Sequence, residues 1–348
     1  MILVKFVSIL HVFVSNTIHI YNINIIYVSN NKSFQHKDQG GETEEVIGEI
    51  LNENPELKKN ISVHTKANPG ITPLTREGLF QQMEDSLNAL QLDCVDIWYL
   101  HAPDISTNYY ETFSACNQLY KEGKFKELGL SNYASWDVVR VHMICRENNW
   151  VCPTVYQGLY NSITRSCENE LIPALRACNM RGYWYNPVAG GLLTGRYRSM
   201  EDGDQAGRFS TFGFAGGATG NKSGGDDQLP GGSKIYRSRY FKNEVFSALD
   251  IVRDGCEKAN ISMAEAAVRW VKSHSALNGK YGDGLIFGAS KLHHVEQNLQ
   301  SAINNESLTK DLIDSFDNAW TVASPTAENY MRGYGRRPGG SERFLAKY

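Results

Sequence analysis

A repeat dominates the sequence: a short β-rich run is followed by a helical segment, and the pair returns about every thirty residues, as in β–α–β units. Strands joined through helices run parallel, because the chain returns to the same end of the sheet before each new strand begins. The expected strands lie near residues 61, 95, 125, 154, 183 and 285, with a seventh, poorly defined, in the first forty residues. The repeat therefore predicts an α/β protein whose parallel sheet either stays open or closes into a barrel.

The residues that follow the expected strands favour the barrel. Polar residues or glycines stand at successive strand ends, namely Lys66, His101, Ser131–Asn132, Gln157, Tyr185–Asn186 and Gly288–Ser290. An active site at the carboxyl ends of the strands is typical of the (β/α)8 TIM barrel. No Gly-x-Gly-x-x-Gly run opens an early helix, so the phosphate-binding turn of an open dinucleotide-binding sheet has no counterpart in this sequence.

The composition is that of an ordinary globular protein, since 41% of the 348 residues are hydrophobic and 21% are charged. A formal charge of −3 gives no reason to expect nucleic acid or an anionic membrane as a partner. The seven cysteines are scattered and form no Cys-x-x-Cys pair. This pattern indicates reduced thiols in a cytoplasmic protein and no metal site.

The start of the chain differs from the rest, and we divide the sequence into a divergent segment, 1–38, and a barrel domain, 39–348. Residues 1–37 contain no Gly, Ala, Pro, Asp or Glu. The apolar run Met1–Val14 resembles the central part of a signal peptide, but Lys5 lies inside the run and no small-residue cleavage site follows. A targeting segment and an error in exon assignment both remain open.

Six longer motifs follow one another between Gly40 and about Arg332: HTKAN, YLHAPD, GKFKELGLSNYASW, PTVYQGLYN, YNPVAGGLLTGRY and FGASKLHHVEQNL. Each motif alone is a weak signal, whereas all six in this order are specific. The chain resembles the aldo-keto reductases, and within them the aflatoxin aldehyde reductase branch. The resemblance implies a (β/α)8 barrel that binds NADP(H) and reduces carbonyl groups.

The implied reaction passes hydride from a nicotinamide ring to a carbonyl carbon, and the negative charge that develops on the oxygen must be protonated or held by donors. Family members use a tyrosine acid, a lysine that lowers the tyrosine pKa, an aspartate that pairs with the lysine, and a histidine that orients the carbonyl. Lys66 matches the lysine and His101 the histidine. Outside these motifs, the two residues would be interpreted as a surface lysine and a structural histidine.

The family tyrosine and aspartate have no match. The run QGGETEEVIGE resembles the residues after the family tyrosine, but the tyrosine slot holds Asp38 and the aspartate slot holds Ser33. Tyr21 and Tyr27 stand at the wrong spacing. His36 is a candidate proton donor that is more simply interpreted as a solvated loop residue.

The first strand–helix–strand portion of the barrel is therefore expected to be aberrant or missing, and the catalytic tetrad incomplete. Two β-rich runs, Ile2–Val14 and Ile18–Val28, are candidates for substitute strands. A barrel without a strand would expose a sheet edge, which favours aggregation.

The resemblance implies a full set of cofactor contacts, in which Ser131, Asn132 and Gln157 bind the nicotinamide carboxamide and Tyr185 stacks on the ring. Glycines let backbone N–H groups approach the pyrophosphate, and a helix N-terminus with a lysine suits the 2′-phosphate of NADP(H). The remaining implied contacts are Asn186, Pro187, Gly190, Gly191, Leu192, Gly195, Arg196, Gly288, Ser290, Lys291, Gln297 and Asn298.

Substrate residues are implied more weakly. Tyr236, Arg237 and Arg239 resemble residues of the branch's substrate loop, and Arg332 resembles a C-terminal arginine that closes over acidic substrates such as succinic semialdehyde. The alternative interpretation is solvated surface charge. The stretch Gly203–Ser233 is expected to be a lid or linker, and a helix is expected over Phe241–Ala259.

The expected function is the NADPH-dependent reduction of aldehydes, ketones or dicarbonyls by a cytoplasmic enzyme, with a homodimer as an open alternative to a monomer. Two other interpretations remain open. One is a catalytically inactive NADP(H)-binding module similar to the potassium-channel β-subunits, which share the barrel. The other is a truncated product that does not fold stably.

Overall fold

The computed structural model describes residues 9–13, 25–27, 42–204, 209, 231–288 and 292–331. Its centre is one eight-stranded sheet with the order β1-β8-β7-β6-β5-β4-β3-β2. The six strands expected from the repeat are confirmed: β3 (Ser62–Ala67), β4 (Val95–Leu100), β5 (Phe125–Ser131), β6 (Pro153–Leu159), β7 (Arg181–Tyr185) and β8 (Gly284–Gly288). Each runs parallel to its neighbours among these six, as strands joined through helices must.

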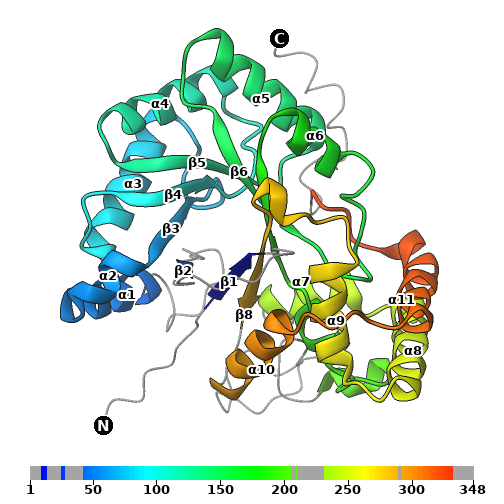
Figure 1. Cartoon of the computed structure of the whole chain (residues 1–348). Coiled ribbons are helices and arrows are strands. Elements are labelled where there is room, and N and C mark those ends of the chain that lie inside the picture. The colour runs from blue at the N-terminus through cyan, green and yellow to red at the C-terminus, as the bar shows by residue number, and fades with distance from the viewer. Residues whose placement is uncertain are drawn as a thin grey trace.

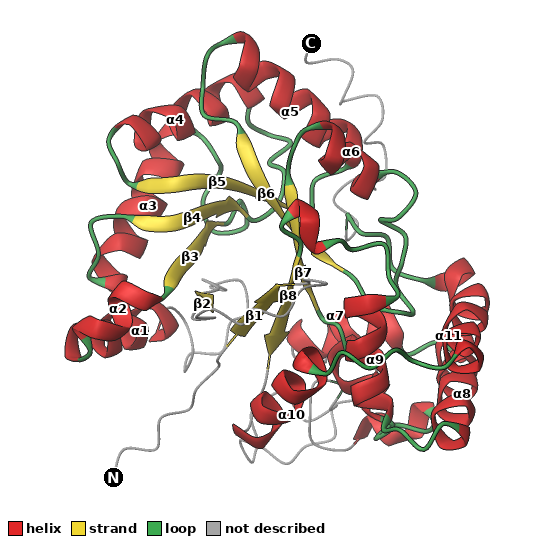
Figure 2. Cartoon of the chain, viewed as in Figure 1, coloured by secondary structure: helices red, strands yellow, loops and turns green. Residues whose placement is uncertain are grey.

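The first forty residues were expected to hold one poorly defined strand. The structure has two strands among the described residues there, and they form the two edges of the sheet. β1 (Ile9–Phe13) and β2 (Ile25–Tyr27) fall inside the two β-rich runs of the N-terminal segment. β2 pairs with β3 in parallel, whereas β1 pairs with β8 antiparallel. β1 and β2 contact each other, so the sheet curls until its two edges meet (Figure 2).

Helices surround the outside of the curled sheet (Figure 1). The helices are α1 (Glu42–Glu53), α2 (Pro55–Asn60), α3 (Arg76–Leu90), α4 (Tyr109–Lys121), α5 (Ser135–Glu147), α6 (Leu171–Ala177), α7 (Gly231–Tyr240), α8 (Asn243–Lys258), α9 (Met263–Ser273), α10 (Leu292–Ile303) and α11 (Lys310–Ala323). Short 3-10 turns are η1 (Ala189–Thr194), η2 (Met200–Asp204), η4 (Gly279–Tyr281) and η5 (Ser324–Thr326).

Helix boundaries in the C-terminal half differ from the expectation. The helix expected from Phe241 begins instead at Asn243, because Lys242 has an extended backbone with φ −139° and ψ 145°. The expected loop Gly203–Ser233 overlaps η2 at its start and α7 at its end. Apart from residue 209, positions 205–230 lie outside the described residues.

Each face of the sheet packs in its own apolar cluster. Trp98 and Leu100 of β4 belong to the large cluster between strands and helices. Ile97 and Tyr99, which alternate with them, belong to a small inner cluster completed by Val155, Tyr183 and Ile286. Because successive strand residues face opposite sides, this alternation means that the inside of the curl is packed with side chains.

No helix among the described residues is long and apolar enough to cross a membrane. Within the same residues, no group of histidine, cysteine and acidic side chains is arranged to hold a metal ion.

Candidate functional site

The residues expected at strand ends gather at one end of the curled sheet. Lys66 is the penultimate residue of β3, His101 directly follows β4, Ser131 ends β5 and Tyr185 ends β7. Gln157 lies in the last half of β6. Since these strands are parallel, all five residues stand at the carboxyl edge of the sheet, where barrel enzymes carry their active sites.

Hydrogen bonds connect neighbouring members of this group. The His101 backbone N–H donates to the carbonyl of Ala67, the residue after Lys66, at 2.8 Å. The Asn132 amide donates from Nδ2 to the carbonyl of His101 at 2.8 Å and to Ser131 Oγ at 3.1 Å. Ser131 in turn pairs with Gln157 in the register of β5 and β6. The group therefore forms a continuous arc from β3 to β6.

These polar side chains are buried. Lys66 is 5% exposed, Gln157 3% and Asn132 1%. Asn132 Oδ1 finds no hydrogen-bond partner among the described residues. A buried amide oxygen normally has a partner, so this atom suits a donor from a ligand, such as the N–H of a carboxamide.

The backbone at the site is unusual at three non-glycine positions. Asn132 has φ 62°, Asn186 has φ 71° and Ala189 has φ 51°. Left-handed conformations are costly for residues with a Cβ, and they cluster at functional sites where the surrounding structure holds them. Asparagine tolerates this region best among non-glycine residues, which explains why asparagine occupies two of the three positions.

A glycine-rich turn follows β7. Gly190, Gly191 and Gly195 all have positive φ values, of 68°, 107° and 77°. A Cβ on Gly191 would meet nothing within 4 Å, whereas a Cβ on Gly190 would lie 2.8 Å from the Tyr236 ring. The Gly190 N–H donates to Asn186 Oδ1 at 2.6 Å. The turn is thus held by one asparagine and leaves backbone accessible at Gly191, as a pyrophosphate site requires.

The expected substrate residues Tyr236 and Arg239 lie on α7, against this turn. Arg239 is only 3% exposed, so its interpretation as a solvated surface charge is wrong. Its guanidinium lies 5.4 Å from the Tyr236 ring centroid and 5.8 Å from that of Tyr240. Cation–π contacts of this kind stabilise a partly desolvated arginine.

Tyr240 was not expected from the sequence. Its hydroxyl accepts from Nδ2 of Asn161 at 3.1 Å and from Nδ2 of Asn186 at 2.8 Å. It therefore fixes α7 to the residue that follows β7. Asn161 stands four residues after Gln157 in the same motif, but nothing local to the sequence connects it with Tyr240.

A polar layer inside the sheet, below the strand ends, was also missed. Arg181 and Glu127 form an ion pair with Nη1–Oε2 2.7 Å and Nη2–Oε1 2.8 Å, and Arg181 Nε donates to Tyr183 Oη at 3.0 Å. The His64 and Tyr183 rings stack with centroids 6.2 Å apart. Burial lowers the pKa of His64 to about 3. Alternating polar residues at inward strand positions are the only signal that could have indicated this layer.

The other expected residues lie on different elements. Gly288 ends β8, which is parallel to β7, and is exposed at the same carboxyl edge, whereas Gln297 and Asn298 lie on α10. Tyr27 ends β2, with its backbone in register with His64. Outside the described residues lie Tyr21, Ser33, His36, Asp38, Ser290, Lys291 and Arg332. The exposed Arg196 and the buried Pro187 and Leu192 belong to the glycine-rich turn.

Comparisons with known proteins identify a family. Residues 5–321 match the model of the "Aldo/keto reductase family". The chain is 41% identical over 299 residues to aflatoxin B1 aldehyde reductase member 2 of Rattus norvegicus, covering 84% of this chain and 76% of the relative. It is 40% identical over 298 residues to member 4 of Homo sapiens, covering 84% of each chain.

A fungal aldo-keto reductase of Pseudocercospora fijiensis is 37% identical over 257 residues, covering 74% of this chain and 80% of the relative. The family match therefore extends beyond the mammalian aflatoxin aldehyde reductases and spans most of the chain. Together with the polar arc at the carboxyl ends of parallel strands, these matches show that the chain belongs to the aldo/keto reductase family.

Proposed function

We propose that the protein is an NADPH-dependent reductase of aldehydes and dicarbonyls with a (β/α)8 barrel whose first units are replaced by β1 and β2. The observation that carries this proposal is the arc formed by the buried Lys66, Asn132 and Gln157 and the partly buried His101 at the carboxyl ends of β3 to β6. The names of the mammalian relatives, aflatoxin B1 aldehyde reductases, support an aldehyde as substrate.

The described residues fit a nicotinamide dinucleotide. Asn132 Oδ1, buried without a partner among them, suits a carboxamide N–H, and Gly191 offers open backbone for phosphate oxygens. Bound NADPH would supply hydride to the substrate. Ser131 and Gln157 are register partners in β5 and β6, which supports the proposal that both side chains bind the carboxamide; Tyr185, at the end of β7, is proposed to pack on the ring.

Two residues carry the proposed chemistry of the carbonyl. Lys66, 5% exposed, would place a positive charge near the oxygen on which negative charge develops. His101 would orient the same oxygen from the end of β4. Arg239, in contact with the rings of Tyr236 and Tyr240, would supply positive charge on the α7 side, which suits a substrate with a carboxylate. Arg332 is proposed for the same role and lies outside the described residues.

A second candidate function is an NADP(H)-binding module without turnover. The observation that favours it is the absence of the family tyrosine and aspartate from their slots, which hold Asp38 and Ser33. Without the tyrosine, the proton for the carbonyl oxygen has no assigned donor. The two functions share the cofactor site and differ only in turnover.

Two measurements separate these functions. Quenching of tryptophan fluorescence by NADPH tests the cofactor site, and its absence would refute both proposals. NADPH oxidation with 4-nitrobenzaldehyde or succinic semialdehyde tests the reductase, whereas binding without oxidation supports the module. Lys66→Met should lower any turnover by about 10²-fold or more, because the variant loses the positive charge that stabilises the transition state. Its affinity for NADPH should stay largely intact. Unchanged turnover would refute the role of Lys66.

We also infer a cytoplasmic location, because all seven cysteines are free thiols. The domain division at residue 39 and the homodimer remain proposals. Gel filtration with light scattering measures the oligomeric state directly.

A further inference from the structure

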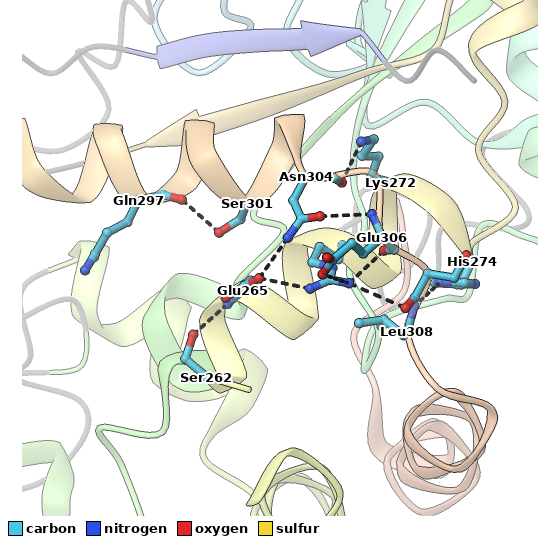
Figure 3. Close-up of polar contacts among 11 residues, drawn as sticks. Ser262, Glu265, Lys272, His274, Gln297, Ser301, Asn304, Glu306 and Leu308 are labelled. Atoms are coloured by element: carbon cyan, nitrogen blue, oxygen red, sulfur yellow. Dashed lines mark hydrogen bonds and ion pairs between the residues drawn. The ribbon is translucent and has the colours of Figure 1, made fainter. Parts of the chain in front are cut away.

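Two basic side chains of α9, Arg269 and Lys272, bond backbone carbonyls of the turn between α10 and α11. His274, which directly follows α9, contacts the same turn, and Figure 3 shows the contacts of Lys272 and His274. His274 Nε2 accepts from the Leu308 backbone N–H at 3.3 Å. We call Arg269, Lys272 and their partners in this turn the α9 clamp.

The clamp is buried and well bonded. Arg269 is 6% exposed, and it donates to Glu265 Oε1 at 2.9 Å and to the Glu306 carbonyl at 2.7 Å. Lys272 is 8% exposed, and its ammonium donates to the Asn304 carbonyl at 2.9 Å and to Asn305 Oδ1 at 2.6 Å. Hydrogen bonds from buried charged donors are stronger than neutral ones, so the turn is fixed firmly to α9.

The clamp binds the carboxyl-terminal end of α10. The helix ends at Ile303, and Lys272 bonds the carbonyl of the next residue, Asn304. Cations at a helix C-terminus interact favourably with the helix dipole. The Asn304 amide also donates to Glu265 Oε1 at 3.3 Å. The position of α10 along its own axis is therefore set largely by α9.

The other end of α9 lies against the glycine-rich turn. A Cβ on Gly195 would lie only 3.1 Å from Met263 Sδ, so the first residue of α9 packs directly on this glycine. α9 thus contacts the glycine-rich turn after β7 at one end and the end of α10 at the other. The family resemblance implies phosphate contacts on this turn, and it implies that Gln297 and Asn298 of α10 contact the adenosine half of the cofactor.

We propose that Arg269 and Lys272 are positioning residues for the adenosine 2′-phosphate half of the cofactor. They touch no cofactor themselves and act by fixing α10 relative to the glycine-rich turn. The inference rests on the proposed NADPH function. It predicts that weakening the clamp lowers affinity for the adenosine half of the cofactor and spares the chemistry at β3 to β6.

The test compares Lys272→Met and Arg269→Lys with the wild-type protein. Lys272→Met keeps the length of the side chain but removes its charge, and Arg269→Lys keeps the charge but cannot bond Glu265 and the Glu306 carbonyl together. NADPH and adenosine 2′,5′-bisphosphate are titrated by tryptophan fluorescence, and unfolding is followed in urea. The matched control is Arg165→Met, which removes an arginine that pairs with Glu168 and Asp317 and lies over the Trp270 ring of α9, but that is not one of the residues of the α9 clamp.

Both clamp variants should bind NADPH and the bisphosphate about tenfold more weakly, the change that about 1.4 kcal/mol of binding free energy produces. Arg165→Met should be destabilised to urea but bind both ligands as the wild type does. If the clamp matters only for stability, the folded variants will bind both ligands with the wild-type dissociation constants. That result, with a wild type that binds NADPH, would overturn the inference. Failure of the wild type to bind NADPH would instead refute the proposed function and the inference with it.

Discussion

Gly129 of β5 lies where the structure leaves no room for a Cβ atom. A Cβ added there would lie 2.3 Å from Tyr99 Cδ1 and 2.5 Å from Cε1. Ordinary carbon contacts lie at about 3.5–4.0 Å, so Gly129→Ala would have to push the ring away by about 1 Å or more. Tyr99 is fully buried in the inner cluster beside Val155 and Tyr183, and little space is open to it.

Overpacking of this kind costs about 1–3 kcal/mol in the free energy of unfolding. We expect Gly129→Ala to lose this amount in urea denaturation followed by circular dichroism. Because Tyr99 is the register partner of Lys66, any turnover should fall as well. Gly123→Ala is the control: its Cβ would meet nothing within 4 Å, and only its φ of 73° opposes the change.

A double-mutant cycle with Tyr99→Ala tests the cause. If the clash is with the ring, Gly129→Ala should cost almost nothing in the Tyr99→Ala protein, because the space is then open. The coupling energy should equal most of the single-mutant loss, about 1–3 kcal/mol. Additive losses would show that Gly129 matters for another reason and would refute the packing argument.

Three further predictions concern single residues. Burial lowers the pKa of His64 from 6.5 to about 3. The unfolded chain therefore binds a proton at His64 below pH 6.5 while the folded protein does not, and the free energy of unfolding falls as the pH drops from 6.5 toward 3, by about 1 kcal/mol at pH 5.5. His64→Gln should show a shallower pH dependence of this free energy in urea denaturation. Asn132→Ala removes both amide hydrogen bonds and places alanine at φ 62°, which should cost about 2–4 kcal/mol and abolish NADPH quenching; wild-type affinity would contradict the site. Tyr240→Phe leaves the Asn161 and Asn186 amides without their shared acceptor, so stability should fall by about 1–3 kcal/mol, and an equally stable variant would show that this link is not needed.

The strands of the parallel sheet could be predicted because their signal is local. Val95–Leu100 is apolar at every position except Asp96, and the structure places β4 over the same residues. The polar residues at or near the strand ends, such as Lys66 and His101, could be predicted for the same reason. α7 could not, because Gly231–Tyr240 has two leading glycines, three basic residues and two serines, and its helix is supported instead by contacts such as that of Tyr240 with Asn186.

Contacts between residues far apart in the chain could not be predicted from the sequence. The residues around Gly129 have the pattern of an ordinary strand. This pattern does not indicate that the ring of Tyr99, thirty residues earlier, lies against the Gly129 Cα. The α9 clamp is likewise spread over Arg269, Lys272 and a turn more than thirty residues later. Local pattern predicts the elements, whereas the contacts that position them follow from packing in three dimensions.

The N-terminal segment shows how differently fold and chemistry depend on sequence. Edge strands pair through backbone N–H and C=O groups, which every non-proline residue carries. β1 and β2 can therefore cover β8 and β3 without any family motif, one of them in the reversed direction. A proton donor, in contrast, requires one side chain at one place, and Asp38 stands in the slot that the family resemblance gives to the tyrosine. The segment can thus complete the sheet that carries the proposed cofactor site on β5 to β7 without supplying that donor, which is why turnover and NADPH binding must be measured separately.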